Sequence, residues 1–102
     1  MIVLGGAALD PDAPLPEIGN VSIIDKSFRP GSIVVATGGS VEWSNDDGEG
    51  HTVTAVDGSF NSGIVTVGDE FSRAFETAGT FDHFCAIHPE MSGTGTVGEA
   101  TP

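Results

Sequence analysis

Basic residues are scarce in this chain. Among 102 residues there are three, Lys26, Arg29 and Arg73, against 15 acidic ones, and the formal net charge is −12 at pH 7. Proteins that bind nucleic acids neutralise phosphates with clustered Lys and Arg. Attraction to an anionic membrane surface depends on the same residue types. The charge therefore excludes a conventional nucleic-acid-binding protein and a protein held on a membrane by its basic surface.

Cysteine and long apolar runs are also lacking. Cys85 is the only cysteine, so no intramolecular disulfide can form, and a single thiol is buried and inert, reactive, or a metal ligand. No run approaches the roughly 20 apolar residues of a membrane helix, so we expect no direct membrane insertion. The apolar opening, residues 1–9, is short and no basic residue precedes it, which makes it a poor secretion signal. If the native protein is exported, we expect a start codon to have replaced its signal here.

Helical periodicity is absent from every window of ten or more residues. Short alternating or β-branched segments recur instead, separated by Gly-rich and polar turns, which predicts an all-β fold: an antiparallel Greek-key sandwich or barrel of seven to eight strands. Three prolines between residues 11 and 16 disfavour regular structure. We therefore predict an extended arm or linker over residues 1–17 and one domain over 18–102. The expected strand segments are 21–24, 33–36, 41–44, 52–54, 64–67, 71–75, 80–85 and 94–97.

Potential metal ligands follow the segment 80–85. Cys85, His88 and Met91 are spaced three apart, and in a tight loop this spacing lets three side chains converge. His51 lies 34 residues upstream, directly after a Gly-flanked acidic loop. The end of one strand and the start of another can share one edge of a sandwich, so His51 is the fourth candidate.

The chemistry of these four side chains favours copper. Two histidines and a cysteine with a weak axial methionine form the arrangement of blue-copper electron-transfer sites. Zinc also accepts Cys and His, but methionine adds nothing for a metal that prefers Cys, His and carboxylate. For each residue taken alone, an ordinary structural role remains the alternative: a buried thiol, a turn histidine or a core methionine.

Two separated motifs resemble the cupredoxins, particularly the plastocyanin and amicyanin branch. Val41-Glu-Trp-Ser-Asn45 followed by His51-Thr-Val-Thr is similar to the region of the first histidine in that family. The segment from Gly79 to Thr94 is similar to its Cys–His–Met loop, in the short amicyanin-like form with two residues between successive ligands. The resemblance covers about residues 20–98 and implies a cupredoxin-like copper-binding domain.

The resemblance also implies a role for each matched residue. His51 and His88 would bind one type 1 copper ion through ring nitrogens, Cys85 would bind as thiolate, and Met91 would be the long axial ligand. His88 would present an edge to solvent among apolar neighbours. In the reduced state, His88 is expected to take up a proton and leave the metal at mildly acid pH.

Two residues beside the ligands have implied supporting roles. Asn45 would tie the two metal-bearing loops together by hydrogen bonds, with an ordinary turn residue as the alternative. The backbone N–H of Thr52 would point at the Cys85 sulfur and tune the potential.

Other residues are interpreted as structural. His83 lies on the same strand face as Cys85, and we expect a core histidine satisfied by a hydrogen bond, with a pH-dependent modulator of the site as the alternative. Trp43 and most phenylalanines are expected to fill the core, while Phe84 could offer a second electron route. The acidic loop 46–49 is either a solvated surface loop or a docking patch for a basic partner.

Together these features predict a small soluble electron carrier cycling between Cu(I) and Cu(II), a monomer with no enzymatic activity of its own. Its partner would be a redox protein such as a cytochrome or a copper enzyme, and a basic partner is one alternative. Two alternatives remain: an electron-transfer domain excised from a larger copper oxidase or reductase, and a copper-binding or delivery module. We expect a periplasmic or extracellular location.

Overall fold

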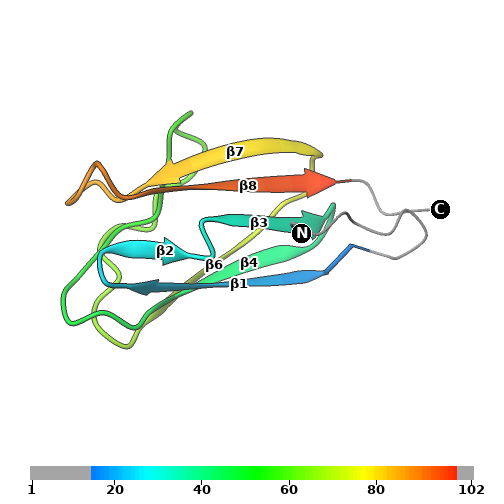
Figure 1. Cartoon of the computed structure of the whole chain (residues 1–102). Coiled ribbons are helices and arrows are strands. Elements are labelled where there is room, and N and C mark those ends of the chain that lie inside the picture. The colour runs from blue at the N-terminus through cyan, green and yellow to red at the C-terminus, as the bar shows by residue number, and fades with distance from the viewer. Residues whose placement is uncertain (1–14, 99–102) are drawn as a thin grey trace.

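The computed structural model describes residues 15–98, which form a two-layer β-sandwich (Figure 1). Eight strands are divided between two four-stranded sheets, so the predicted all-β sandwich is confirmed. The strands are β1 (Ile18–Ile24), β2 (Ser27–Arg29), β3 (Ser32–Ala36), β4 (Ser40–Asn45), β5 (Thr54–Ala55), β6 (Glu70–Ala74), β7 (Gly79–Phe84) and β8 (Ser92–Gly98). Between residues 15 and 98 there is no helix, and hence none that could cross a membrane.

The sheets are mixed rather than wholly antiparallel. One has the order β2-β1-β4-β6 and the other β3-β8-β7-β5. β1 pairs with β4 and β3 with β8 in parallel, whereas the other four ladders are antiparallel. The antiparallel expectation fails at the two parallel pairs. In each pair the chain enters the opposite sheet between the two strands, so that the second strand can run in the same direction as the first.

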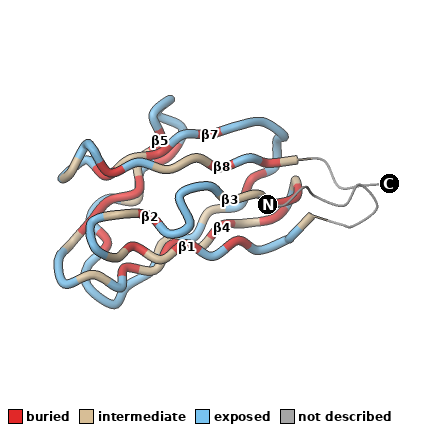
Figure 2. The backbone as a smooth tube through the Cα atoms, in the orientation of Figure 1, coloured by how far each residue is buried: buried red, intermediate tan, exposed pale blue. Residues whose placement is uncertain are grey.

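Alternating burial along the strands builds the core between the sheets (Figure 2). In β4, Val41, Trp43 and Asn45 are buried, and the residues between them are only partly covered. In β7 the buried positions are Phe81 and His83. This alternation continues to Cys85, which is fully buried, so the core-facing side of β7 leads directly into the predicted metal-binding loop.

Aromatic rings fill the centre of the core. Trp43 is completely buried and lies 6.0 Å from Phe60 and 5.7 Å from Phe71, measured between ring centroids. Phe75 stacks on Phe81 at 4.2 Å. The expected core-filling role of these residues is therefore confirmed, with Phe71 partly rather than fully buried. Rigid rings packed from both sheets hold the strands that carry the site.

Three segments depart from the expected strands. β2 forms around Phe28, where no separate strand was expected, and Ile23 pairs with Phe28 across the β1–β2 ladder. The segment 64–67 forms no strand but a single bridge between His51 and Val65. In β6, Phe71 and Arg73 are the partly covered positions, and the buried Phe75 directly after the strand continues their side of the alternation.

The predicted arm lies mostly outside the described residues, which begin at Leu15. Its last two residues hydrogen-bond to the sandwich: the Pro16 carbonyl accepts from the N–H of Ala36 at 2.8 Å, and the Glu17 carbonyl from that of Ser40 at 2.9 Å. These bonds join the residues before β1 to one strand of each sheet.

Candidate metal centre

Cys85 begins the loop that connects β7 to β8, at the left end of the sandwich in Figure 1. Its N–H donates to the Met91 carbonyl at 3.0 Å, and the N–H of Met91 donates to the His88 carbonyl at 2.8 Å. These two bonds close residues 85–91 into a tight loop. The three-residue spacing therefore brings Cys85 and His88 together, as the sequence predicts.

His51 reaches the same end from the other side. It follows the acidic loop after β4, and it exchanges two backbone hydrogen bonds with Val65, at 3.2 and 2.7 Å. Its side chain is fully buried. The bridge to Val65 fixes the backbone of His51, so that its ring meets a loop 34 residues away in sequence.

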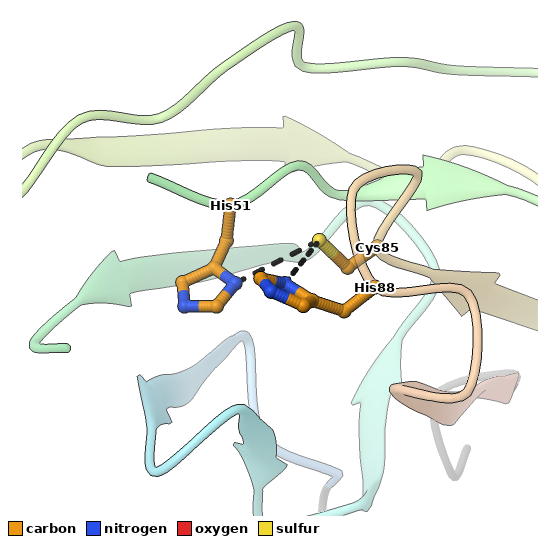
Figure 3. Close-up of side chains that lie close together, drawn as sticks. All are labelled: His51, Cys85 and His88. Carbon is orange, nitrogen blue, oxygen red and sulfur yellow. Dashed lines mark hydrogen bonds between the residues drawn. The ribbon is translucent and has the colours of Figure 1, made fainter. Parts of the chain in front are cut away.

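The three side chains converge on a single point (Figure 3). Nδ1 of His51 lies 3.7 Å from Sγ of Cys85, and Nδ1 of His88 lies 3.9 Å from the same sulfur. All three ligand atoms are within 4.8 Å of one another. Metal–nitrogen and metal–sulfur bonds are about 2.0 and 2.3 Å for zinc, so atoms at these separations can share one ion. The residues present fit a type 1 copper ion.

Met91 is buried beside this group, with 3% of its surface exposed. Its backbone closes the loop at both Cys85 and His88, so the residue is anchored at the centre. Its role as the axial ligand stays a prediction.

The surroundings of Cys85 favour its thiolate. Burial on its own raises the pKa of this thiol, but the N–H of Thr52, 3.4 Å from Sγ, and the rings of His51 and His88 together lower the pKa to about 6. The thiolate is the form that binds metals. The predicted contact from the Thr52 N–H to the sulfur is present in the structure.

His51 also has a shifted pKa. Burial lowers the pKa of its ring, but the contacts with Cys85 and Asp47 outweigh that effect and raise it overall. Two neighbouring negative groups therefore surround a buried imidazole. These two groups favour positive charge on the His51 ring itself.

The hydrogen bond that links the two metal-bearing loops comes from Thr52, not from Asn45. Oγ1 of Thr52 accepts from the Ala86 N–H at 2.7 Å. The amide of Asn45 donates instead to the carbonyls of Glu49, at 2.9 Å, and Val65, at 2.8 Å. The expected role of Asn45 is therefore wrong. At the end of β4 its side chain hydrogen-bonds to the acidic loop and to the Val65 segment, and it does not join the two metal-bearing loops.

Thr52→Val is expected to lower the free energy of unfolding by about 1 kcal/mol, because the Ala86 N–H loses its acceptor. The backbone donor to Cys85 remains, so copper-loaded protein should keep its thiolate band. Urea unfolding and the visible spectrum measure the two effects separately. Thr80→Val, at an exposed strand position, is the control, and equal stability of both variants would contradict the role of Thr52.

His83 lies in the core on the same face as Cys85, as predicted, but without a hydrogen bond. Neither ring nitrogen has a partner within residues 15–98. The ring packs against Phe28 at 4.7 Å and Trp43 at 5.4 Å, between centroids. It also occupies the space above Gly93, where a Cβ would meet Nε2 at 2.7 Å. The expected hydrogen bond is wrong because aromatic rings and a glycine surround this side chain.

Burial lowers the pKa of His83 from 6.5 to about 4. As the pH falls, the unfolded chain therefore binds a proton at this position before the folded chain does. His83 leaves the free energy of unfolding unchanged above pH 6.5 and lowers it by about 3 kcal/mol as the pH falls to 4. His83→Leu should remove that part of the acid destabilisation. Urea unfolding of the metal-free proteins at pH 7 and 4.5 measures it, and identical pH dependence in both would disprove it.

The acidic loop contacts both histidines. Oδ2 of Asp47 lies 2.8 Å from Nε2 of His51, and Oε1 of Glu49 lies 3.3 Å from Nε2 of His88. Lys26, in the turn between β1 and β2, approaches both carboxylates. Sequence reasoning missed these contacts. The four-residue spacing of Asp47 and His51 was the one available signal, and nothing in the sequence indicates that Lys26 lies nearby.

Comparison with known proteins places this geometry among copper proteins. No family model matches the chain. Plastocyanin from Scenedesmus fuscus is 28% identical over 81 residues, which cover 69% of this chain and 83% of the relative. Chloroplastic plastocyanin from Tetradesmus obliquus is 29% identical over 83 residues, 71% of this chain and 55% of the relative.

Solved structures agree with the sequence relatives. A purple cupredoxin from Nitrosopumilus maritimus aligns with a TM-score of 0.72 and 28% identity, over 78% of this chain and 98% of its own. An oxidised methionine-to-leucine variant of amicyanin has a TM-score of 0.74 at 24% identity, over 84% and 92%, and so supports the fold. The copper-containing nitrite reductase of Thermus scotoductus has a TM-score of 0.75 at 26% identity and matches 95% of this chain, but only 25% of the reductase is covered.

Proposed function

Because the protein is a plastocyanin-like cupredoxin with a His-Cys-His group placed to hold one type 1 copper ion, we propose that it is a small electron carrier that exchanges single electrons with redox partners. The convergence of the two Nδ1 atoms on the Cys85 sulfur carries this proposal. His51, Cys85 and His88 would hold the ion, with Met91 as the axial ligand. Copper, when bound, supplies a one-electron Cu(I)/Cu(II) couple.

The protein matrix suits a site that changes little between two oxidation states. His51 and Cys85 are fully buried, which excludes water from most of the site. The Val65 bridge and the Thr52–Ala86 hydrogen bond fix the backbone on both sides. Side chains held in this way need little rearrangement when the charge of the site changes, and fast electron exchange requires that property.

His88 connects the buried group with the surface. Its side chain is 19% exposed, whereas that of His51 is fully covered. The neighbouring Ile87 is 46% exposed, and Pro89 is exposed as well. We propose that a redox partner docks over His88 and makes electronic contact through its ring. The −12 net charge favours a partner with a basic face.

The absence of a reaction of its own and an exported location belong to the same proposal. A single-electron exchange requires neither a substrate pocket nor an acid–base pair. A plastocyanin relative is described as chloroplastic, which supports a compartment reached by export. We place the protein in the periplasm or outside the cell.

A titration with copper and then with a one-electron reductant tests the proposal. One Cu(II) per chain should bind with an intense visible band, and one electron per copper should bleach the band reversibly. A colourless protein that binds zinc with the same stoichiometry would overturn the proposal. A chain that binds Cu(I) tightly, releases it to a chelating acceptor and shows no reversible oxidation would instead indicate a copper delivery module.

The reductase alignment supports a second candidate, an electron-transfer domain of a larger copper enzyme. The two candidates differ in their partner: a domain would exchange electrons with a catalytic centre in its own polypeptide. The length of the native gene distinguishes them. A coding sequence that extends into a further copper-binding domain would favour the second.

A further inference from the structure

Asp47 makes a short contact with the distal nitrogen of a buried histidine. Its Oδ2 lies 2.8 Å from Nε2 of His51. The carboxylate side chain is 18% exposed and the imidazole is fully covered. On the opposite side of the same ring, Nδ1 faces the Cys85 sulfur at 3.7 Å. The imidazole is therefore held between an oxygen acceptor and the metal-binding group.

A carboxylate next to Nε2 determines where the ring proton lies. An ionised carboxylate only accepts hydrogen bonds, and the Asp47 carboxylate already accepts from the N–H groups of Lys26 and Gly48. Nε2 of His51 must then carry the proton. Nδ1 is left as the nitrogen whose lone pair a metal can use, and outer hydrogen bonds of this kind orient histidine ligands.

The Asp47 side chain is itself held in place. Oδ2 accepts from the Lys26 N–H at 3.0 Å and Oδ1 from the Gly48 N–H at 2.9 Å. The Asp47 N–H donates to Oδ1 of Asn45 at 3.0 Å. Lys26 reaches this position because Asp25 and Lys26 both have positive φ, 53° and 54°, in the tight turn between β1 and β2. A hairpin turn of one sheet thus orients the carboxylate that faces His51.

Glu49 makes a looser contact of the same kind with the second histidine. Its Oε1 lies 3.3 Å from Nε2 of His88, and its Oε2 lies 3.8 Å from Nζ of Lys26. Glu49 is 44% exposed, so water competes for this carboxylate. The contact is weaker than that of Asp47 and lies where we propose that a partner docks.

We propose that Asp47 is a positioning residue, which keeps the proton on Nε2 of His51 so that Nδ1 is presented to the metal beside Cys85. Glu49 has the same role for His88 at the surface, with a smaller effect. The inference rests on the proposed function for the identity of the ion alone. The alternative is that Asp47 only caps its own loop through the N–H groups of Lys26 and Gly48.

Nitrogen-15 NMR of the metal-free, reduced protein at pH 8 tests the proton position directly. In the wild type, Nε2 of His51 should carry a slowly exchanging proton. Asp47→Ala should lose that slow exchange, and Asp47→Asn, whose amide oxygen can still accept, should retain it. Asp46→Ala is the matched control, because Asp46 accepts from the Ser22 hydroxyl at 2.5 Å in the same loop. An unprotonated Nε2 in the wild type would overturn the proposal.

Cu(I) affinity, measured by competition with a chelator, gives the second readout. Asp47→Ala should bind Cu(I) about 10- to 100-fold more weakly, Asp47→Asn should recover most of the loss, and Asp46→Ala should match the wild type. If Asp47→Ala binds as tightly as Asp46→Ala, Asp47 is only a loop cap. If the wild type binds no copper, the proposed function fails, while the NMR result still decides the position of the proton.

Glu49→Gln and Glu90→Gln separate contact from charge at His88. Both remove one negative charge, and Glu90 lies two residues from His88 in the metal-binding loop. We expect Glu49→Gln to speed proton exchange at Nε2 of His88 and to weaken Cu(I) binding several-fold, with Glu90→Gln close to the wild type. Equal effects of the two variants would remove Glu49 from the proposal.

Discussion

Cys85→Ser is expected to abolish the intense visible band of the copper-loaded protein. The band requires a thiolate bound to Cu(II), and Cys85 is the only cysteine in the chain. Its environment, which lowers the thiol pKa to about 6, cannot make a serine hydroxyl ionise at neutral pH. Copper affinity should fall as well, because two histidines and a buried hydroxyl form a poorer site for a soft metal.

Ala86→Ser is the matched control for this experiment. It places a hydroxyl at the next, exposed position in the loop and leaves the thiol intact, so the band should keep its intensity. Both proteins should have wild-type unfolding curves without metal. Serine is nearly isosteric with cysteine at position 85, and position 86 is exposed. A band that survives in Cys85→Ser would show that the colour arises elsewhere and would contradict the assigned site.

The metal site could be found from the sequence because its ligands lie close together in the chain. Cys85 and His88 share one tight loop, so their spacing almost determines their geometry. His51 was harder to place, because it meets the loop through the packing of two sheets. A polar, Gly-flanked loop before a β-branched segment was its local signal, and the resemblance to a known family supplied the rest.

The errors concern partners that only the folded chain brings together. Asn45 was expected to join the two loops, but the backbone of Ala86 finds its acceptor in Thr52. His83 was expected to have a polar neighbour, and it instead faces aromatic rings. Single-sequence patterns show that such a residue is buried. They do not show which atoms surround it.

The acidic loop shows the same limit at the metal site. Charge and composition indicate only that residues 46–49 are polar and exposed to some degree. In the fold, Asp47 turns inward to His51 and Glu49 lies against His88. Their neighbour Lys26 is more than 20 residues away and is placed by a turn with two positive φ angles. Two of the 15 acidic residues, Asp47 and Glu49, therefore contact the histidines of the site, in addition to adding negative charge to the surface.

Gly95→Ala is expected to destabilise the fold far more than the same methyl addition at Gly48. Gly95 pairs with Phe81 across β7 and β8, and a Cβ at Gly95 would collide with the Phe81 ring. The ring cannot move away, because Phe75 stacks on it at 4.2 Å and Phe60 lies 5.8 Å away between centroids. Overpacking of this kind costs about 1–3 kcal/mol, occasionally more.

Thermal unfolding of the metal-free protein measures the effect of Gly95→Ala, at about 4–8 °C per kcal/mol for a domain of this size. Gly48→Ala is the control, since an added Cβ there has no atom within 4 Å, and its stability should stay within about 0.5 kcal/mol of the wild type. Combining Gly95→Ala with Phe81→Leu should cost less than the sum of the single changes, because the smaller side chain leaves room for the methyl group. Additive losses would show that the two residues do not compete for space. β7, which leads into Cys85, would then owe its position to other contacts.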